Sequence, residues 1–390
     1  MGLIKKRLLF DRIVDGQPIP NGLSDQSLID QYLADGTCSI YRSKGLPYSL
    51  ETLDDVEFCN VADVDTGVYP VCLHDPSFFT FREIKQLVAN FNSRTLKLIK
   101  RGDIQLSFFI EEEPYKDVHQ VITLCAILYS WEILRFRIFS SIDPSEYAHT
   151  EYASHFRHSA DNEFEISTFD EVGDTLPADF RFSLLQYSEN TYDWRVATIG
   201  ALKRFGILDS TLFTYNLDAA CLVDEPRIFN ENEFTGIKRR MPAFLKSIKP
   251  HVYPRLKYNT VHTSSRFSII MEAYLSKQVN LNYTYITEKS FRPLWWKQPF
   301  VVIGQSHTLR LLHRRGYRTF APVIDESYDT IEDDMSRLHA VTQELIRLNS
   351  LSYAEFDELI HDCQDVVDHN YAHFKSLKEQ YIEHIFEERS

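Results

Sequence analysis

Short, almost continuously apolar segments are the feature that most constrains the fold of this chain. Three are clear, at residues 104–110 (IQLSFFI), 266–271 (RFSIIM) and 300–303 (FVVI). Runs of this length and composition are typical of strands buried on both faces of a parallel sheet. Segments with helical spacing lie beside them, at 192–205, 289–296 and 308–315. This alternation predicts an α/β fold with parallel sheets.

The same patterns predict how the chain is divided. A length of 390 residues is enough for two ordinary cores. We expect an N-terminal α/β domain at 1–180, a second α/β domain at 181–330, and a helical segment at 331–390 that packs back on both. Two further elements are expected: one buried helix covering 121–139, too charged to span a bilayer, and a strand starting at 317–320.

Charge is unevenly distributed along the chain. The 42 Lys and Arg against 56 Asp and Glu give −14 overall, which argues against disorder and against a generally basic nucleic-acid coat. Residues 181–320 nevertheless hold 21 bases and 10 acids. Local positive charge on an acidic protein favours a polyanionic ligand, either a nucleotide diphosphate or a nucleic-acid backbone. The alternative is a set of solvated helix faces that pair with the acidic half.

Several common signatures are absent from the sequence. It contains no G-x-G-x-x-G, P-loop, H-E-x-x-H or G-x-S-x-G, and its six cysteines form no C-x-x-C pair. With no signal peptide and no spanning segment, we expect reduced thiols in a soluble, cytoplasmic protein. Asp63 and Asp65 form a D-x-D that could hold a divalent metal. Such a pair arises easily by chance among 56 acids, so no essential metal is expected.

The most informative stretch runs from 266 to 304. A strand ends at Glu272, and further on Thr287 can cap a helix that begins with Glu288 and Lys289. A helix start with Lys289 and Arg292 on its first turns makes an anion site, and Glu288 is a good acceptor for ribose hydroxyls. The alternative is an ordinary capped helix with a solvated lysine.

The motifs of this stretch resemble two related groups of enzymes. F-S-I-I-M-E, Y-I-T-E-K-S-F-R-P and Q-P-F-V-V-I-G resemble the donor-binding motif of α-1,3-fucosyltransferases. They resemble more closely bacteriophage-encoded glycosyltransferase-like proteins, which also share a G-[FY]-x-T-F segment and D-E-S-Y-D, here 316–320 and 325–329. The helix led by Arg195 is similar too, whereas Ala273 replaces the Asn that follows the glutamate in fucosyltransferases.

The resemblance implies a GT-B-like architecture, in which two Rossmann-like domains face each other across a cleft and C-terminal helices follow. It implies a donor site for a UDP- or GDP-linked sugar. In that site Glu288 would bind ribose, Lys289 and Arg195 the diphosphate, and Glu272 the donor sugar or nucleotide. The full set of donor-binding candidates is Arg195, Arg266, Glu272, Thr287, Glu288, Lys289 and Arg292.

An inverting transfer needs a carboxylate that deprotonates the acceptor hydroxyl. Glu112 and then Glu111 are preferred because they follow a predicted strand, with Asp11 and Asp15 as further candidates; the alternative is an exposed acidic turn. The acceptor we consider is a hydroxymethylated base, such as hydroxymethylcytosine, in phage DNA, contacted by Lys238, Arg239 and Arg240. A surface glycan or a protein is equally open. The competing interpretations are an inactive nucleotide-sugar or glycan binding module of a virus, and a metal-dependent enzyme that uses Asp63 and Asp65.

Overall fold

The structure is a computed structural model of the whole chain. It describes residues 6–14, 17–21, 30, 56–73, 85–86, 88–110, 118–140, 152, 154, 156–158, 180–186, 190–191, 193–215, 221–222, 264–276 and 284–387. The chain divides into two compact units: the first comprises Met1–Thr168 with Leu377–Ser390, and the second Phe169–Ser376. This division falls before the expected boundary at 180. It also assigns residues 331–376 to the second unit and 377–390 to the first.

The first unit is built on a six-stranded parallel sheet in the order β4-β1-β5-β6-β7-β8. Its strands are β1 (Lys6–Phe10), β4 (Val56–Asn60), β5 (Gly67–Leu73), β6 (Ile104–Ile110), β7 (Phe136–Ser140) and β8 (Phe156–His158). A short antiparallel pair, β2 (Ile13–Val14) and β3 (Gln17–Pro18), follows β1. Helices α4 (Ser93–Arg101) and α5 (Val118–Ser130) belong to the same unit.

Local sequence explains the ends of α4. The side chain of Asn92 accepts the N–H of Arg94 at 2.9 Å, and Gly102 ends the helix in a left-handed conformation with φ of 80°. Strands β6 and β7 carry the aromatic core of the unit, where the rings of Phe109 and Phe139 stack with centroids 4.8 Å apart.

The end of the chain packs on the first sheet. Helix α14 (Gln364–Phe386) begins in the second unit, and its last turns belong to the first. Arg137 of β7 donates to the carbonyl oxygens of His384 at 2.8 Å and Glu387 at 2.6 Å, and so caps the end of this helix.

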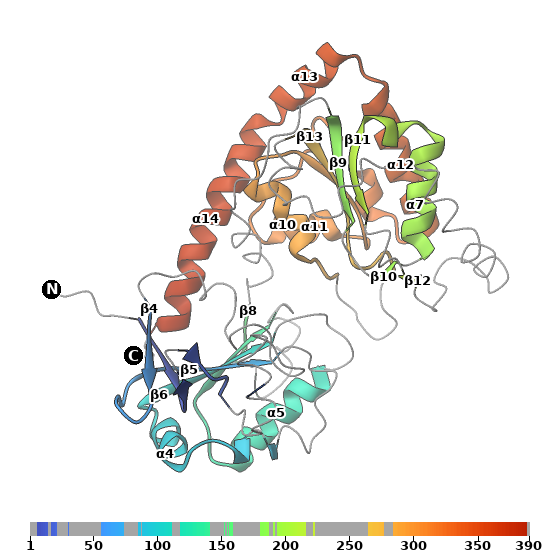
Figure 1. Ribbon diagram of the computed structural model, residues 1–390. Coiled ribbons are helices and arrows are strands. Elements are labelled where there is room, and N and C mark those ends of the chain that lie inside the picture. The colour runs from blue at the N-terminus through green and yellow to red at the C-terminus, as the bar shows by residue number, and fades with distance from the viewer. Residues whose placement is uncertain are drawn as a thin grey trace. The chain divides into compact units, whose positions relative to one another are not determined.

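The second unit contains a four-stranded parallel sheet in the order β11-β9-β13-β14. Its strands are β9 (Phe180–Gln186), β11 (Thr211–Tyr215), β13 (Ser265–Met271) and β14 (Phe300–Ile303). Its main helices are α7 (Asp193–Arg204), α10 (Glu288–Trp295), α11 (Thr308–Arg314), α12 (Asp334–Ser350), α13 (Tyr353–Asp362) and most of α14. Helices α10 and α11 lie on one side of the sheet, and α7 and α12 on the other (Figure 1).

Short elements complete the described part of the second unit. They are a parallel pair of two-residue strands, β10 (Asn190–Thr191) and β12 (Cys221–Leu222), and the 3-10 turns η6 (Ile207–Ser210) and η7 (Ser327–Thr330).

Both sheets wind in the same way, and the predicted α/β class with two Rossmann-like parallel sheets is confirmed. In each sheet the strand that comes first along the chain lies between the second and the third, so the strand order reverses at β1/β5 and at β9/β13. Loops leave the carboxyl ends of such strands in opposite directions, and ligands of doubly wound sheets bind there. A ligand site is therefore expected beside the residues that follow the carboxyl ends of the strands in each sheet.

Two predicted elements are wrong. The helix expected over 121–139 ends at Ser130. Glu132 then adopts a left-handed φ of 61°, and the chain continues as β7. The strand expected at 317–320 is not a strand, because the side chain of Asn370 takes up the main-chain hydrogen bonds of Arg318, at 2.8 and 2.9 Å.

Candidate functional site

The start of α10 is the centre of the candidate site. Thr287 is its N-cap, and its hydroxyl accepts the N–H of Lys289 at 3.4 Å, as the sequence predicted. The eight-residue helix has the positive end of its dipole here, just beyond the carboxyl end of strand β13. A helix start of this kind is able to bind an anion.

Glu272 holds this helix start in place. It follows β13, is 1% exposed, and accepts a hydrogen bond from the Thr287 hydroxyl at 2.6 Å and from the Thr287 N–H at 3.2 Å. The hydroxyl of Ser290 also donates to this carboxylate. The carboxylate of Glu272 therefore positions α10. The predicted contact of Glu272 with a donor stays a prediction.

Gly304 allows this arrangement by lacking a side chain. A Cβ at position 304 would lie 3.1 Å from the Cβ of Glu272, and the N–H of Glu272 donates to the carbonyl of Ile303 at 2.9 Å. A side chain at position 304 would therefore crowd Glu272.

Three charged side chains surround the first turns of α10. Glu288 accepts hydrogen bonds from Lys289 and Arg292, both at 2.9 Å, and their side chains are 17%, 22% and 8% exposed. Burial raises the pKa of Glu288, but the charges of Lys289 and Arg292 outweigh it and lower the pKa to about 2. Glu288 is therefore ionised, and the trio carries one net positive charge. Lys289 and Glu288 are the partly exposed members, so they are the side chains a ligand reaches first.

Arg195 reaches the same edge from α7. It is 2% exposed, and its Nη2 donates to the main-chain carbonyl of Glu272 at 2.7 Å. Its guanidinium lies 5.3 Å from the ring centroid of Trp194. Arg195 thus ties α7 to the end of β13, where the strand order reverses. Its contact with a diphosphate stays a prediction.

Arg266 does not belong to this group. It stands at the amino end of β13, six positions before Glu272, and pairs with Asp357 of α13. Neighbouring strand residues rise about 3.3 Å each, so roughly 20 Å separate the two ends. Arg266 was predicted from sequence proximity alone, and the direction of the strand separates it from the site.

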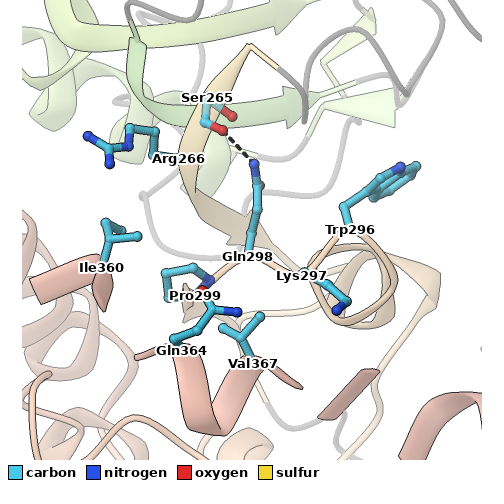
Figure 2. Close-up of a pocket in the computed structure, with 9 residues that line it drawn as sticks. All are labelled: Ser265, Arg266, Trp296, Lys297, Gln298, Pro299, Ile360, Gln364 and Val367. Atoms are coloured by element: carbon cyan, nitrogen blue, oxygen red, sulfur yellow. Dashed lines mark hydrogen bonds between the residues drawn. The ribbon is translucent and has the colours of Figure 1, made fainter. Parts of the chain in front are cut away.

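A cavity of about 250 Å³ lies beside Arg266 (Figure 2). In Figure 2 Gln298 extends toward Ser265, and its amide donates to the Ser265 carbonyl at 2.6 Å. Lys297 at its edge pairs with Asp368 at 2.9 Å, as Arg266 does with Asp357. Both cations are thus neutralised, so the cavity offers no excess positive charge to an anion.

His307 is a residue at the carboxyl edge that the sequence analysis did not identify. It follows β14 and has a left-handed φ of 66°. Its Nε2 lies 2.9 Å from Glu332, and its buried Nδ1 has no hydrogen-bond partner among the described residues. The signal that could have found it is a polar run, Gln305 to His307, directly after an apolar strand.

The D-E-S-Y-D segment supports this edge structurally. Asp329 accepts the N–H groups of Leu309 and Arg310 at 2.9 and 3.1 Å, which caps α11. Burial raises the pKa of Asp329, and these two hydrogen bonds oppose the rise.

Several predicted residues lie outside the described residues: Asp15, Glu111, Glu112, Lys238, Arg239 and Arg240. Asp65 of the D-x-D pair is described and pairs with Arg94 at 2.8 Å. Within the described ranges, no three His, Cys, Asp or Glu side chains gather in a metal-binding cluster. None of the helices described there is long and apolar enough to cross a bilayer.

Comparison with known proteins gives limited similarity. No family model matches the chain, and no curated protein matches it. The glycosyltransferase SnogD from Streptomyces nogalater is 10% identical over 87% of this chain and 95% of its own, with a TM-score of 0.32. The calicheamicin glycosyltransferase CalG4 is 11% identical over 97% of this chain and 99% of its own, with a TM-score of 0.31. Scores of this size do not establish a common function.

Proposed function

We propose that the protein is a glycosyltransferase that transfers a sugar from a UDP- or GDP-linked donor to a hydroxyl acceptor. We further propose that the transfer inverts the configuration at the anomeric carbon of the sugar and needs no divalent metal. The observation that supports it is the start of α10, where Thr287, Glu288 and Lys289 are held by Glu272 at the carboxyl edge of a doubly wound sheet. These are also residues of the motif that resembles glycosyltransferase donor sites.

In this proposal the residues divide into two roles. Lys289 and the N-terminus of α10 neutralise the diphosphate as it leaves, and Glu288 accepts hydrogen bonds from ribose hydroxyls. Arg195, Glu272 and Arg292 hold these groups in place. Arg195 donates to the main-chain carbonyl of Glu272, and the carboxylate of Glu272 accepts a hydrogen bond from the hydroxyl of Thr287. Arg292 donates to the carboxylate of Glu288. Cationic groups that are fixed before the reaction stabilise a developing negative charge without reorganisation.

For the acceptor we propose a hydroxymethylated base in phage DNA, with Lys238, Arg239 and Arg240 contacting phosphates. The general base belongs to the first unit, with Glu112, Glu111, Asp15 and Asp11 as the candidates. This part of the proposal comes from the resemblance and from the charge distribution along the sequence.

A second candidate is a catalytically inactive module that binds a nucleotide sugar or a glycan. The observation that favours it is the inward orientation of Glu272, whose carboxylate serves α10. An inactive descendant of an enzyme would keep such a structural contact while losing its chemistry.

Donor binding is tested by a thermal-shift screen of UDP- and GDP-sugars, followed by calorimetry with the best one. Glu288→Ala and Lys289→Ala should each weaken binding at least tenfold. The matched control is Lys203→Ala, which removes an exposed lysine of the same unit that pairs with Asp209. Equal affinities of wild type and Lys289→Ala would exclude this site.

Catalysis is tested by mass spectrometry of acceptors incubated with the bound donor, hydroxymethylcytosine DNA first. A product with the mass of one added sugar supports the enzyme. Binding of the donor without product on any acceptor, and without release of nucleoside diphosphate, supports the inactive module. Inhibition by EDTA would contradict metal independence.

A further inference from the structure

The cavity beside Arg266 is separate from the start of α10. It lies where strand β13 begins, and a rise of about 3.3 Å per strand residue puts Arg266 roughly 20 Å from Glu272 at the other end. Its volume of about 250 Å³ is slightly below the roughly 300–1,000 Å³ that is usual for pockets of small-molecule ligands. The cavity therefore suits a molecule of one ring and is too small for a whole sugar nucleotide.

Aliphatic side chains form part of the cavity wall. Pro299, just before β14, and Val367, on α14, are buried, and Ile360, on α13, is half-buried. All three are among the lining residues drawn in Figure 2. Transfer of apolar ligand surface from water onto such a wall is favourable. This part of the cavity therefore suits a ligand with an apolar face.

Two cations also line the cavity, and each is paired with a carboxylate. Arg266 pairs with Asp357, and the Nζ of Lys297 lies 2.9 Å from Asp368. The four side chains are 42–55% exposed, so a ligand in the cavity reaches them. Hydrogen bonds from Gln364 and Lys297 lower the pKa of Asp368, which is therefore ionised at neutral pH. The two pairs together carry no net charge.

Paired charges of this kind select against ions. An anion is attracted by Arg266 and repelled by Asp357, and a cation experiences the reverse. Guanidinium and ammonium groups only donate hydrogen bonds, and carboxylates only accept them. A hydroxyl group does both, so it can bind the two members of one pair at once. Exposed ion pairs contribute little to stability, so a hydroxyl group enters between the partners at little cost.

We propose that this cavity binds one neutral sugar ring. A sugar ring has several hydroxyl groups and an apolar C–H face, which match the two ion pairs and the aliphatic wall. The C–H face would lie on Pro299, Ile360 and Val367, and the hydroxyl groups would bind the pairs of Arg266 and Lys297. This site is additional to the donor site at α10 and does not depend on the proposed transfer reaction, because the two lie at opposite edges of the sheet.

The test is a titration of the full chain with the methyl glycosides of glucose, galactose, mannose and fucose, followed by saturation-transfer NMR. A ligand of one ring should bind with a Kd of about 1–10 mM. Gln364→Trp places a bulky side chain at a lining position and should weaken binding about tenfold or more. The matched control is Asp365→Trp, at the next residue of α14, which is 89% exposed and does not line the cavity; it should keep the wild-type Kd.

Two further variants separate ligand binding from folding. Lys297→Gly removes one cation, and glycine adopts the φ of 54° at this position without strain. Glycoside binding should weaken about fivefold while the thermal unfolding midpoint stays unchanged or rises, a combination that a purely structural lysine would not give. Asp357→Asn leaves the charge of Arg266 uncancelled, so inorganic phosphate should compete with the glycoside in this variant and not in the wild type.

The outcomes keep this site and the donor site apart. Lys289→Ala should lose the sugar nucleotide and keep the glycoside, whereas Gln364→Trp should do the opposite. Absence of binding by all four glycosides at about 100 mM, tenfold above the expected range, overturns the sugar site and leaves the donor site standing. Binding that survives Gln364→Trp, or that UDP or GDP abolishes, places the sugar elsewhere and also overturns it. If Gln364→Trp does not fold, Lys297→Gly decides.

Discussion

The hydroxyl of Thr287 lies 2.6 Å from the carboxylate of Glu272, so the residue that follows strand β13 holds the first turn of helix α10. The N–H of Thr287 and the hydroxyl of Ser290 donate to the same carboxylate. The strand end and the helix start thus form one rigid structure, and Lys289 and Glu288 project from it.

Glu272→Gln should therefore destabilise the protein more than its small size change suggests. The new amide group would face donors that need an acceptor, and an unsatisfied buried donor costs about 1–3 kcal/mol. Urea unfolding measures this difference. Glu358→Gln, at an exposed position of α13, should stay within about 0.5 kcal/mol of wild type. Equal stability of the two variants would contradict the role of Glu272 as the support of α10.

The charged trio of α10 predicts how stability depends on pH. The pKa of Glu288 is lowered from 4.5 to about 2, so its ionised form is stabilised by folding. This contribution is fully present above about pH 4.5 and is lost as the pH falls toward 2, with an upper limit of roughly 3 kcal/mol.

The measurement is the difference in unfolding free energy between wild type and Glu288→Gln from pH 7 to pH 2.5. Burial raises the pKa values of Glu326 and Asp329, which act in the opposite direction, so the raw curve of one protein mixes these effects. The difference between the two proteins should shrink as the pH falls below 4.5. A constant difference would show that Glu288 has no favourable partners in solution.

The left-handed backbone conformation of a non-glycine residue, Lys297, provides another prediction. Lys297 has a φ of 54°, a conformation that glycine adopts without strain. Lys297→Gly should be neutral or should stabilise the protein by up to about 1 kcal/mol, because the exposed ion pair with Asp368 that it loses is worth little. Lys203→Gly in the last turn of α7 should instead cost about 1 kcal/mol. The thermal unfolding midpoint should stay unchanged or rise for Lys297→Gly and fall for Lys203→Gly, and equal losses would contradict the conformation at Lys297.

Local sequence signals located the strands and the helix start but not the contacts between distant segments. The apolar runs at 104–110 and 300–303 coincide with β6 and β14, and Thr287 is the N-cap that its position before Glu288 predicted. These features depend on neighbours within a few residues. The segment 121–139 was misassigned because a mostly apolar run fits a buried helix and a buried strand equally well.

What the sequence analysis could not predict depends on long-range contacts. Asn370 completes the main-chain hydrogen bonds of Arg318, although the two residues are 52 positions apart in the sequence. No local sequence pattern predicts such a contact. Arg266 is near Glu272 in sequence, yet the extended strand carries the two to opposite edges of the sheet. Asp11 was one candidate among many acids, and only the folded chain brings Tyr69 and Thr95 to it.

Gly304→Ala tests whether support of Glu272 and donor binding are coupled. The new Cβ would lie 3.1 Å from the Cβ of Glu272 and 3.3 Å from its Cγ, so Glu272 has to shift by a few tenths of an ångström. Overpacking of this kind costs about 1–3 kcal/mol. Because Glu272 holds Thr287 and Ser290, the shift should also reduce donor affinity, by about threefold or more.

Gly206→Ala is the matched control for Gly304→Ala. That glycine has a φ of 72° and open space around its Cβ position, with Asp209 at 3.8 Å, so the variant loses stability through backbone strain while donor affinity stays at the wild-type value. Calorimetric titration of both variants with the same sugar nucleotide makes the comparison, and equal affinity in the two would show that α10 binds its ligand independently of the Glu272 contact.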